Sequence, residues 1–238
     1  MPTDTVMVKT HDGSEMPAFL AMPESGRGPG IVILQEIFGI TDYLRRRARD
    51  LADLGYVALV PDLFWRVGTN VNIAEDTQEG LQEAFGYLQK MDEAQAVDDV
   101  VAALEYLRAR PETGGQAGVL GFCMGGRIAY KVAAASEPDV VVSYYGSGIG
   151  SLLSDASRVR SPILFHFGAS DAYLPASEAE EIRSAFSGKR DAQVEMHAGA
   201  GHAFDNPSPM FHHADASREA WPQTAEFLRR HMPPAARN

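Results

Sequence analysis

The amino-acid sequence predicts an α/β fold with a mainly parallel central sheet, helices on both faces and an antiparallel hairpin at the N-terminus. Short apolar runs alternate with segments of helical periodicity along most of the chain, which is typical of parallel strands joined by helices. The strand-like runs are continuously apolar, as in "IVIL" at residues 31–34, so we expect both faces of the sheet to be covered. An Asp-Gly turn signal in "HDGS" separates two extended runs and predicts the hairpin.

The other elements follow from apolar runs, helical periodicity and chain breakers. Strands are expected at about 31–34, 55–61, 116–122, 139–146, 161–168 and 192–198. Helices are expected from Thr41 or Asp42 onward and at about 92–110, 126–136, 176–186 and 214–231. Pro61 is expected to stop one strand, and Pro111 marks the exit from one helix.

The helix that begins near Thr41 has a clear apolar stripe. Its apolar residues recur at three-to-four-residue spacing: Leu44, Ala48, Leu51 and Leu54. The stripe leaves the arginines at 45–47 mainly on the outer side, so we interpret them as a solvated face.

Residues 63–91 differ from the rest of the chain. They mix Gly, Asn and acidic residues with scattered aromatics, and no helical period is clear until the last third. We therefore expect an excursion that passes over the active-site side of the sheet. A single domain is expected over residues 1–238, with a disordered tail at 233–238.

Charge and cysteine content limit the function classes. A formal net charge of -11 argues against nucleic acid or an anionic membrane as a partner, because phosphate binding requires clustered Lys and Arg. One cysteine cannot form an internal disulfide, and the N-terminus lacks a secretory signal, so we expect a cytoplasmic protein. No apolar run approaches the roughly 18 residues of a transmembrane helix. A small molecule is the expected partner, and a monomer and a weak homodimer both stay open.

The stretch "VLGFCMGGRIAY" at residues 119–130 places the only cysteine between glycines. Gly121 to Gly125 fit the pattern glycine, any residue, nucleophile, any residue, glycine, with Cys123 as the nucleophile between a strand and a helix. The helix that starts at the thiol favours a thiolate, and the Met124 N–H can stabilise an oxyanion. The alternative is a buried apolar cysteine, the usual fate of a lone one.

A base and an orienting acid follow Cys123 in the chain order that is typical of such a strand–nucleophile–helix turn. Asp171 comes after the strand that ends near Gly168, and His202 lies in a glycine-rich loop after the last strand. His202 could exchange a proton with the thiol or the leaving group, while Asp171 fixes its tautomer. Asp171 could instead cap the helix that follows it.

The other histidines point to structure rather than chemistry. His166 lies inside an apolar strand and is interpreted as a core residue with its hydrogen bonds satisfied. His212 and His213 are adjacent, so they lack the spacing of a helical metal pair, and no second cysteine is present. We expect no metal site.

Glu36 follows directly on a buried strand, at the edge where such folds hold their ligands. A salt bridge is one explanation. The alternative is that its carboxylate faces Cys123 and keeps the thiol protonated, because a nearby negative charge disfavours a thiolate.

Glu36, "GFCMGG", "GASDAYLP" and "GAGHAF" together resemble the dienelactone hydrolase family, a cysteine branch of the α/β-hydrolases, over nearly the whole chain. The resemblance implies an α/β-hydrolase fold and a triad of Cys123, Asp171 and His202. It implies that Glu36 holds the resting thiol and helps to activate it, and that the N–H groups of Ile37 and Met124 form the oxyanion hole. It implies no metal or organic cofactor.

The chain departs from the family where a substrate carboxylate would bind. Dienelactone hydrolases carry arginines in the excursion and after the catalytic histidine, whereas Leu81 and Asn206 stand at the matching positions. Asn206 and the apolar residues of the excursion are therefore the candidate substrate contacts, the latter being Phe64, Trp65, Leu81 and Phe85. This favours neutral lactones or esters, although Arg66 could serve as a substitute anchor.

The leading hypothesis is a cysteine-dependent hydrolase that opens a lactone or small carboxylic ester through an acyl-cysteine intermediate, with a role in aromatic degradation. A broad carboxylesterase or thioesterase for neutral substrates is an alternative. A non-catalytic small-molecule binding module and a redox sensor based on Cys123 stay open as readings from other classes.

Overall fold

The computed structural model describes residues 2–234 and contains one eight-stranded sheet with the order β1-β2-β4-β3-β5-β6-β7-β8. The strands are β1 Thr3–Lys9, β2 Glu15–Ala21, β3 Gly30–Leu34, β4 Val57–Pro61, β5 Ala117–Phe122, β6 Val141–Tyr144, β7 Ile163–Gly168 and β8 Ala192–His197. β1 pairs antiparallel with β2, and β2 pairs antiparallel with β4, while all other pairings are parallel. The predicted fold class and N-terminal hairpin are confirmed.

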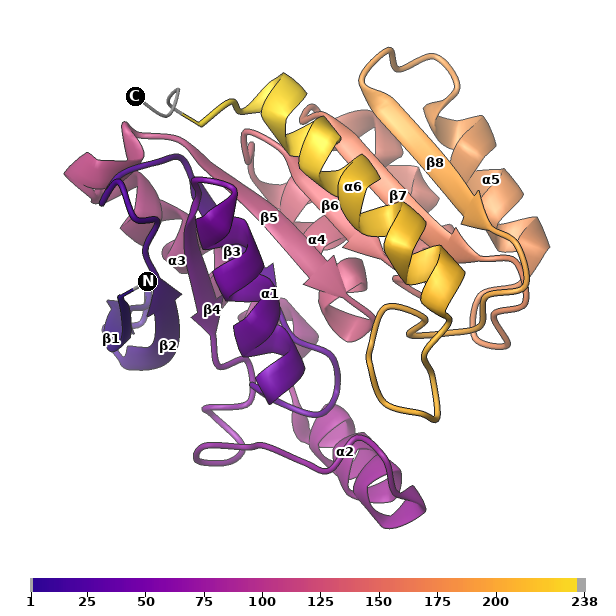
Figure 1. Cartoon of the computed structure of the whole chain (residues 1–238), viewed down its shortest axis with the longest axis horizontal. Coiled ribbons are helices and arrows are strands. Elements are labelled where there is room, and N and C mark those ends of the chain that lie inside the picture. The colour runs from indigo at the N-terminus through magenta and orange to yellow at the C-terminus, as the bar shows by residue number, and fades with distance from the viewer. Residues whose placement is uncertain (1, 235–238) are drawn as a thin grey trace.

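Helices cover both faces of the sheet (Figure 1). They are α1 Asp42–Asp53, α2 Gln78–Lys90, α3 Glu93–Ala109, α4 Met124–Ala135, α5 Ala176–Phe186 and α6 Ala214–His231, with 3-10 segments at Pro111–Thr113 and Ile149–Arg158. One apolar core joins α1 and α6 to one face, and a second joins α3, α4 and α5 to the other. None of the helices in residues 2–234 is both long and apolar enough to cross a membrane.

The predicted elements are present, and the helices at 176–186 and 214–231 begin and end where the sequence predicts. In the excursion, the helical part is α2, which begins at Gln78, before the last third where the sequence pattern becomes clear. Its N-cap residue Thr77 accepts a hydrogen bond from the Gly80 N–H through its side chain. Of the predicted tail, residues 233 and 234 have no regular secondary structure, and residues 235–238 lie outside the described residues.

The interpretation of the arginines at 45–47 as a solvated face is wrong for Arg47, whose side chain is only 13% exposed. Three consecutive residues of an α-helix span about 200° around its axis, so they cannot all share one side. Arg47 lies three residues after Leu44 and four before Leu51, which places it beside the apolar stripe.

The sheet brings the predicted site residues to one edge. β3 pairs with β5 from Gly30–Ala117 to Leu34–Gly121, so the turns after both strands lie side by side. Glu36 follows β3 and Cys123 follows β5, while Asp171 and His202 lie in the loops after β7 and β8. Ligands of open α/β sheets bind at this carboxyl edge.

Candidate active site

Cys123 occupies a strained turn between β5 and α4. Its backbone has φ 54° and ψ -117°, outside the regions that a non-glycine residue usually adopts. A Cβ on Gly121 would overlap the Gly125 carbonyl, so the strand and helix can approach this closely only with glycine there. Tyr145 after β6 and Ala203 beside His202 also have positive φ, at 39° and 55°.

A chain of hydrogen bonds joins the three residues of the predicted triad. His202 Nε2 lies 3.1 Å from Cys123 Sγ, and His202 Nδ1 lies 2.8 Å from Asp171 Oδ2. The other Asp171 oxygen accepts the Tyr173 N–H at 2.8 Å. Asp171 does not cap α5, whose N-cap is Pro175, so its buried carboxylate serves to orient His202 and the loop around it.

The surroundings of His202 favour its protonated form. Burial lowers its pKa, but Cys123 and the hydrogen bond to Asp171 outweigh that effect and raise the pKa to about 11. The Cys123 thiol lies at the N-terminus of α4, where the helix dipole stabilises negative charge. This arrangement favours an imidazolium at His202, next to the Cys123 sulfur.

The two predicted oxyanion-hole residues flank the thiol. Ile37 and Met124 line the same cavity as Cys123. Met124 is the first residue of α4, where N–H groups have no intrahelical acceptor. Within residues 2–234, no hydrogen bond occupies the Ile37 N–H.

Glu36 lines the cavity, but its hydrogen-bond partner is Asn206 rather than Cys123. Asn206 Nδ2 donates to Glu36 Oε2 at 2.6 Å, and Glu36 Oε1 is buried with no partner among the described residues. Burial, then the charge of Glu75, raise the Glu36 pKa to about 8. No salt bridge involves Glu36 within the described part of the chain, so the salt-bridge reading is excluded there.

The cavity beside Cys123 has a volume of about 360 Å³ and mainly apolar walls. Apolar side chains from α2, the β3 loop and the last loop line it: Ile37, Phe38, Leu81, Phe85, Leu88, Met91 and Phe211. Arg127 is the one Lys or Arg on the wall, and it is already engaged, since its Nε binds Glu93 and its Nη1 donates to the Gly148 carbonyl, each at 2.7 Å.

The predicted substrate contacts divide into two groups. Leu81 and Phe85 line the cavity, but Phe64, Trp65 and Asn206 do not. Phe64 is fully buried against Tyr87, and Trp65 Nε1 donates a hydrogen bond to Asp99 on α3. Both residues lie in the segment just after β4, which packs against α3 before the chain reaches α2.

The alternative anchor Arg66 is also held away from the cavity. Its guanidinium binds Asp99 through two nitrogens, at 2.8 and 2.9 Å, and Asp12 at 2.8 Å. Three of its five N–H donors are thus bound to acids, and Arg66 does not line the cavity.

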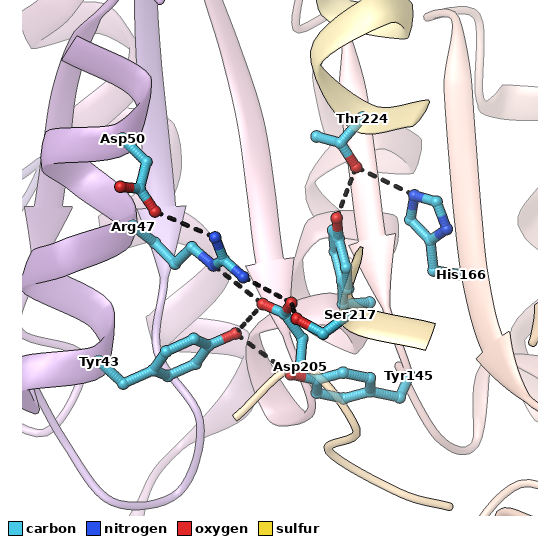
Figure 2. A network of polar contacts seen from close by, with 9 residues as sticks. Tyr43, Arg47, Asp50, Tyr145, His166, Asp205, Ser217 and Thr224 are labelled. Carbon is cyan, nitrogen blue, oxygen red and sulfur yellow. Dashed lines mark hydrogen bonds and ion pairs between the residues drawn. The ribbon is translucent and has the colours of Figure 1, made fainter. Parts of the chain in front are cut away.

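A buried ion pair behind the His202 loop escaped the sequence prediction (Figure 2). Asp205 is buried and accepts Arg47 Nε at 2.9 Å, Arg47 Nη2 at 2.5 Å, the Tyr43 hydroxyl at 2.5 Å and Ser217 Oγ at 2.7 Å. Tyr43 also contacts the Tyr145 hydroxyl at 3.4 Å. The network joins α1 and α6 to the loop that carries His202. Its only sequence signal is the aspartate in "HAFDN".

His166 is a core residue, as predicted. It is fully buried, its Nδ1 lies 3.0 Å from His197 Nε2, and its Nε2 lies 3.0 Å from Thr224 Oγ1 (Figure 2). Elsewhere in residues 2–234, no group of three or more His, Cys, Asp or Glu side chains could hold a metal ion.

Comparison with known proteins shows which family this chain resembles in sequence and fold. Carboxymethylenebutenolidase from Pseudomonas putida is 33% identical over 228 residues, covering 96% of this chain and 97% of the relative. Carboxymethylenebutenolidase 1 from Cupriavidus pinatubonensis is 34% identical over 230 residues, covering 96% and 97%. A solved dienelactone hydrolase-like promiscuous phosphotriesterase from metagenomic libraries has a TM-score of 0.80 and 27% identity, covering 98% of this chain and 100% of that one. The model of the dienelactone hydrolase family matches residues 16–232, and the chain belongs to that family of hydrolases.

Proposed function

We propose that the protein is a cysteine hydrolase that opens neutral lactones or small carboxylic esters through an acyl-cysteine intermediate. The observation that carries the proposal is the unbroken chain from Asp171 through His202 to Cys123 at the wall of an apolar cavity. The carboxymethylenebutenolidase relatives support a lactone or ester as the class of substrate.

The geometry suits nucleophilic acyl transfer. The Cys123 thiolate attacks the acyl carbon, and the carbonyl electrons move to an oxygen stabilised by the N–H groups of Ile37 and Met124. The bond to the alkoxide then breaks, and His202 gives its proton to that oxygen. Neutral His202 next takes a proton from water, the hydroxide attacks the thioester, and Cys123 leaves as the thiolate.

The cavity supports a neutral substrate. A charged hydrogen bond to a substrate carboxylate contributes roughly 1.5–3 kcal/mol, and no free guanidinium is available to make one. Leu81 presents an apolar wall, and Arg127 would have to exchange Glu93 for the substrate. Leu81, Phe85 and Leu88 instead offer apolar contact area.

A non-catalytic binding module and a redox sensor are less well supported. A binding module needs no oriented histidine within 3.1 Å of a thiol. A redox sensor usually holds a resolving cysteine, and the chain has one cysteine only. A burst of product from an activated ester, equal in amount to the enzyme, would separate the hydrolase from both.

The test replaces the nucleophile. Cys123→Ala should remain folded and lose nearly all hydrolysis of an activated ester, because the small side chain still fits the turn. Cys123→Ser should keep weak activity at most, because His202 must then deprotonate a far less acidic hydroxyl. Mass spectrometry of the wild-type enzyme, quenched during turnover, should detect the acyl group on Cys123. Near-normal turnover in the alanine variant would refute the assignment.

The substrate is tested by pairing lactones with linear esters and thioesters, each with and without a carboxylate. Neutral members should be hydrolysed at least as well as carboxylated ones. A strong preference for the anion that collapses in Arg127→Gln would show that Arg127 is the carboxylate anchor.

A further inference from the structure

A second carboxyl group lies next to Glu36. Glu75 precedes α2, and its Oε1 accepts a hydrogen bond from Asn206 Nδ2 at 2.8 Å. The same nitrogen donates to Glu36 Oε2 at 2.6 Å. Asn206 is fully buried, and its Oδ1 accepts the Ser208 N–H at 2.9 Å, which fixes the amide orientation. One amide group therefore bridges two carboxyl groups.

The position of Glu75 is also fixed. Thr41 Oγ1 donates to Glu75 Oε1 at 3.1 Å, and Ser208 Oγ donates to the Glu75 backbone carbonyl at 2.8 Å. These bonds hold the excursion against the loop that carries His202. Glu75 thus cannot turn away from Glu36 without breaking bonds on both sides.

No ion pair neutralises either carboxyl group in residues 2–234, and the charges of His202 and Arg46 act on Glu36 and Glu75 only at a distance. No Lys, Arg or His side chain forms an ion pair with Glu36 or Glu75 in residues 2–234. Two carboxylates that share one site cannot both ionise freely, because each charge raises the cost of the other. Glu36 is the more deeply buried of the two, so its charged form is the more costly.

We propose that Glu75 is a positioning residue which, through the shared amide of Asn206, makes Glu36 a neutral, hydrogen-bond-donating acid in the resting enzyme. Glu36 lines the cavity, and its buried Oε1, which accepts no hydrogen bond from residues 2–234, is the oxygen left to carry the proton in this proposal. The raised pKa values of both groups agree with this arrangement.

The consequence for Cys123 rests on the proposed function. A neutral Glu36 places no negative charge on the cavity wall, so it does not oppose proton transfer from Cys123 to His202, which lie 3.1 Å apart. This differs from the anionic Glu36 that the sequence suggests. Ionisation of Glu36 at alkaline pH would place a negative charge beside the thiolate and lower the reaction rate.

Several titratable or charged groups surround the two carboxyl groups. Those that influence Glu36 or Glu75 come from α1 and from the loops after β6 and β8: Asp42, Arg46, Tyr43, Tyr145 and His202. Only Glu75 contacts the same amide as Glu36. Its removal is therefore the most direct perturbation.

The experiment follows the protonated carboxyl band of Glu36 by infrared difference spectroscopy of the substrate-free enzyme across pH. Glu36→Gln identifies the band by its absence. In the wild type the band should persist at pH 7 and disappear near pH 8. In Glu75→Gln, which keeps the hydrogen bonds but removes the charge, the midpoint should fall by about one pH unit or more. Asp76→Asn removes a charge from the exposed neighbouring residue and should leave the midpoint unchanged.

An unchanged midpoint in Glu75→Gln, or an equal shift in Asp76→Asn, would overturn the proposal. The alkaline limb of kcat/KM should move with the infrared midpoint in Glu75→Gln. A shifted midpoint in a protein that hydrolyses none of the esters would support the protonated Glu36 and overturn the proposed function, so the two failures are distinguishable.

Discussion

Asp205 lies in the loop that carries His202, and Glu36 binds the next residue of that loop, but the surroundings of these two buried acids differ. Asp205 accepts two hydrogen bonds from Arg47 and one each from two hydroxyl groups. Glu36 binds an amide N–H of Asn206, the residue next to Asp205, lies near the Tyr145 hydroxyl and has a second acid nearby. We infer that the Asp205 carboxylate stabilises the loop, whereas the Glu36 carboxyl group is available for chemistry.

The cost of each arrangement explains where it is found. A buried ion pair offsets the loss of hydration only when hydrogen bonds satisfy both partners, and the Arg47–Asp205 pair meets that condition (Figure 2). An unpaired buried acid avoids the same loss by keeping its proton. Glu36 can therefore change charge within an accessible pH range, and the wall of the cavity is where such a change affects a reaction.

The largest expected effect on stability comes from breaking the buried Arg47–Asp205 ion pair. Arg47→Met should leave Asp205 charged and unpaired and should lower the free energy of unfolding by about 3–5 kcal/mol. Chemical denaturation at pH 7 measures this. Arg46→Met, one residue away and exposed, should change stability by about 0.5 kcal/mol or less. Equal effects of the two substitutions would show that the buried pair has no special role.

Glu36, which has no ion-pair partner in the described residues, should make the stability of the protein depend on pH. The Glu36 pKa in the folded state, about 8, lies above its ordinary value of 4.5, so the native state binds more protons than the unfolded chain between these values. Stability from this group is full below pH 4.5 and is lost as the pH rises toward 8. Glu36→Gln should remove a decline on the order of 3 kcal/mol between pH 5 and pH 8. An identical decline in wild type and variant would contradict this.

A third substitution would give Glu36 a cationic partner, as Asp205 already has. Asn206→Arg supplies Glu36 with the kind of cation that Asp205 already has, so Glu36 should ionise at neutral pH. The added guanidinium should also shift preference toward a carboxylated lactone by about tenfold in kcat/KM, the effect of one charged hydrogen bond. Asn206→Gln lengthens the side chain without charge and should leave the preference unaltered. A similar shift in both variants would assign the effect to size.

The smallest effect is expected at Arg66, which resembles Arg47 because acids already hold it. Arg66→Gln should change the ratio of kcat/KM for carboxylated and neutral esters by no more than about twofold, because the side chain does not reach the cavity. Stability should fall, since Asp99 loses its charged partner and keeps only the Trp65 N–H. Loss of a preference for the anion in this variant would identify Arg66 as a substrate anchor.

Local patterns predicted the elements and the order of the triad. The helix at 176–186 and the turn at Cys123 depend on periodicity and on glycines that are close in sequence. Contacts between distant segments could not be predicted in this way. Arg47 and Asp205 are 158 positions apart, and nothing near either residue indicates the other. The same holds for Asn206, which family resemblance marked as a substrate contact but which binds two acids from other loops.

Of the predicted substrate contacts in the excursion, Leu81 and Phe85 line the cavity but Phe64 and Trp65 do not, for a related reason. Composition identified residues 63–91 as a separate region, but it did not indicate which aromatic side chains would turn inward. Just after β4, Trp65 bonds to Asp99 and Phe64 packs against Tyr87. Leu81 and Phe85 instead lie on the face of α2 that lines the cavity. The helical period of α2 shows which of its side chains share a face. It does not show that this face meets the cavity, because that depends on where the helix packs.

The backbone at Cys123 sets a limit on how this enzyme can be improved. A non-glycine residue at positive φ costs about 1–3 kcal/mol, and three of the four such residues in the described part of the chain cluster at the site. Glycine would relieve that cost at position 123 and would remove the nucleophile. A directed-evolution screen that rewards thermal tolerance alone would thus enrich inactive enzymes, and selection for turnover keeps the protein below the stability its fold could reach.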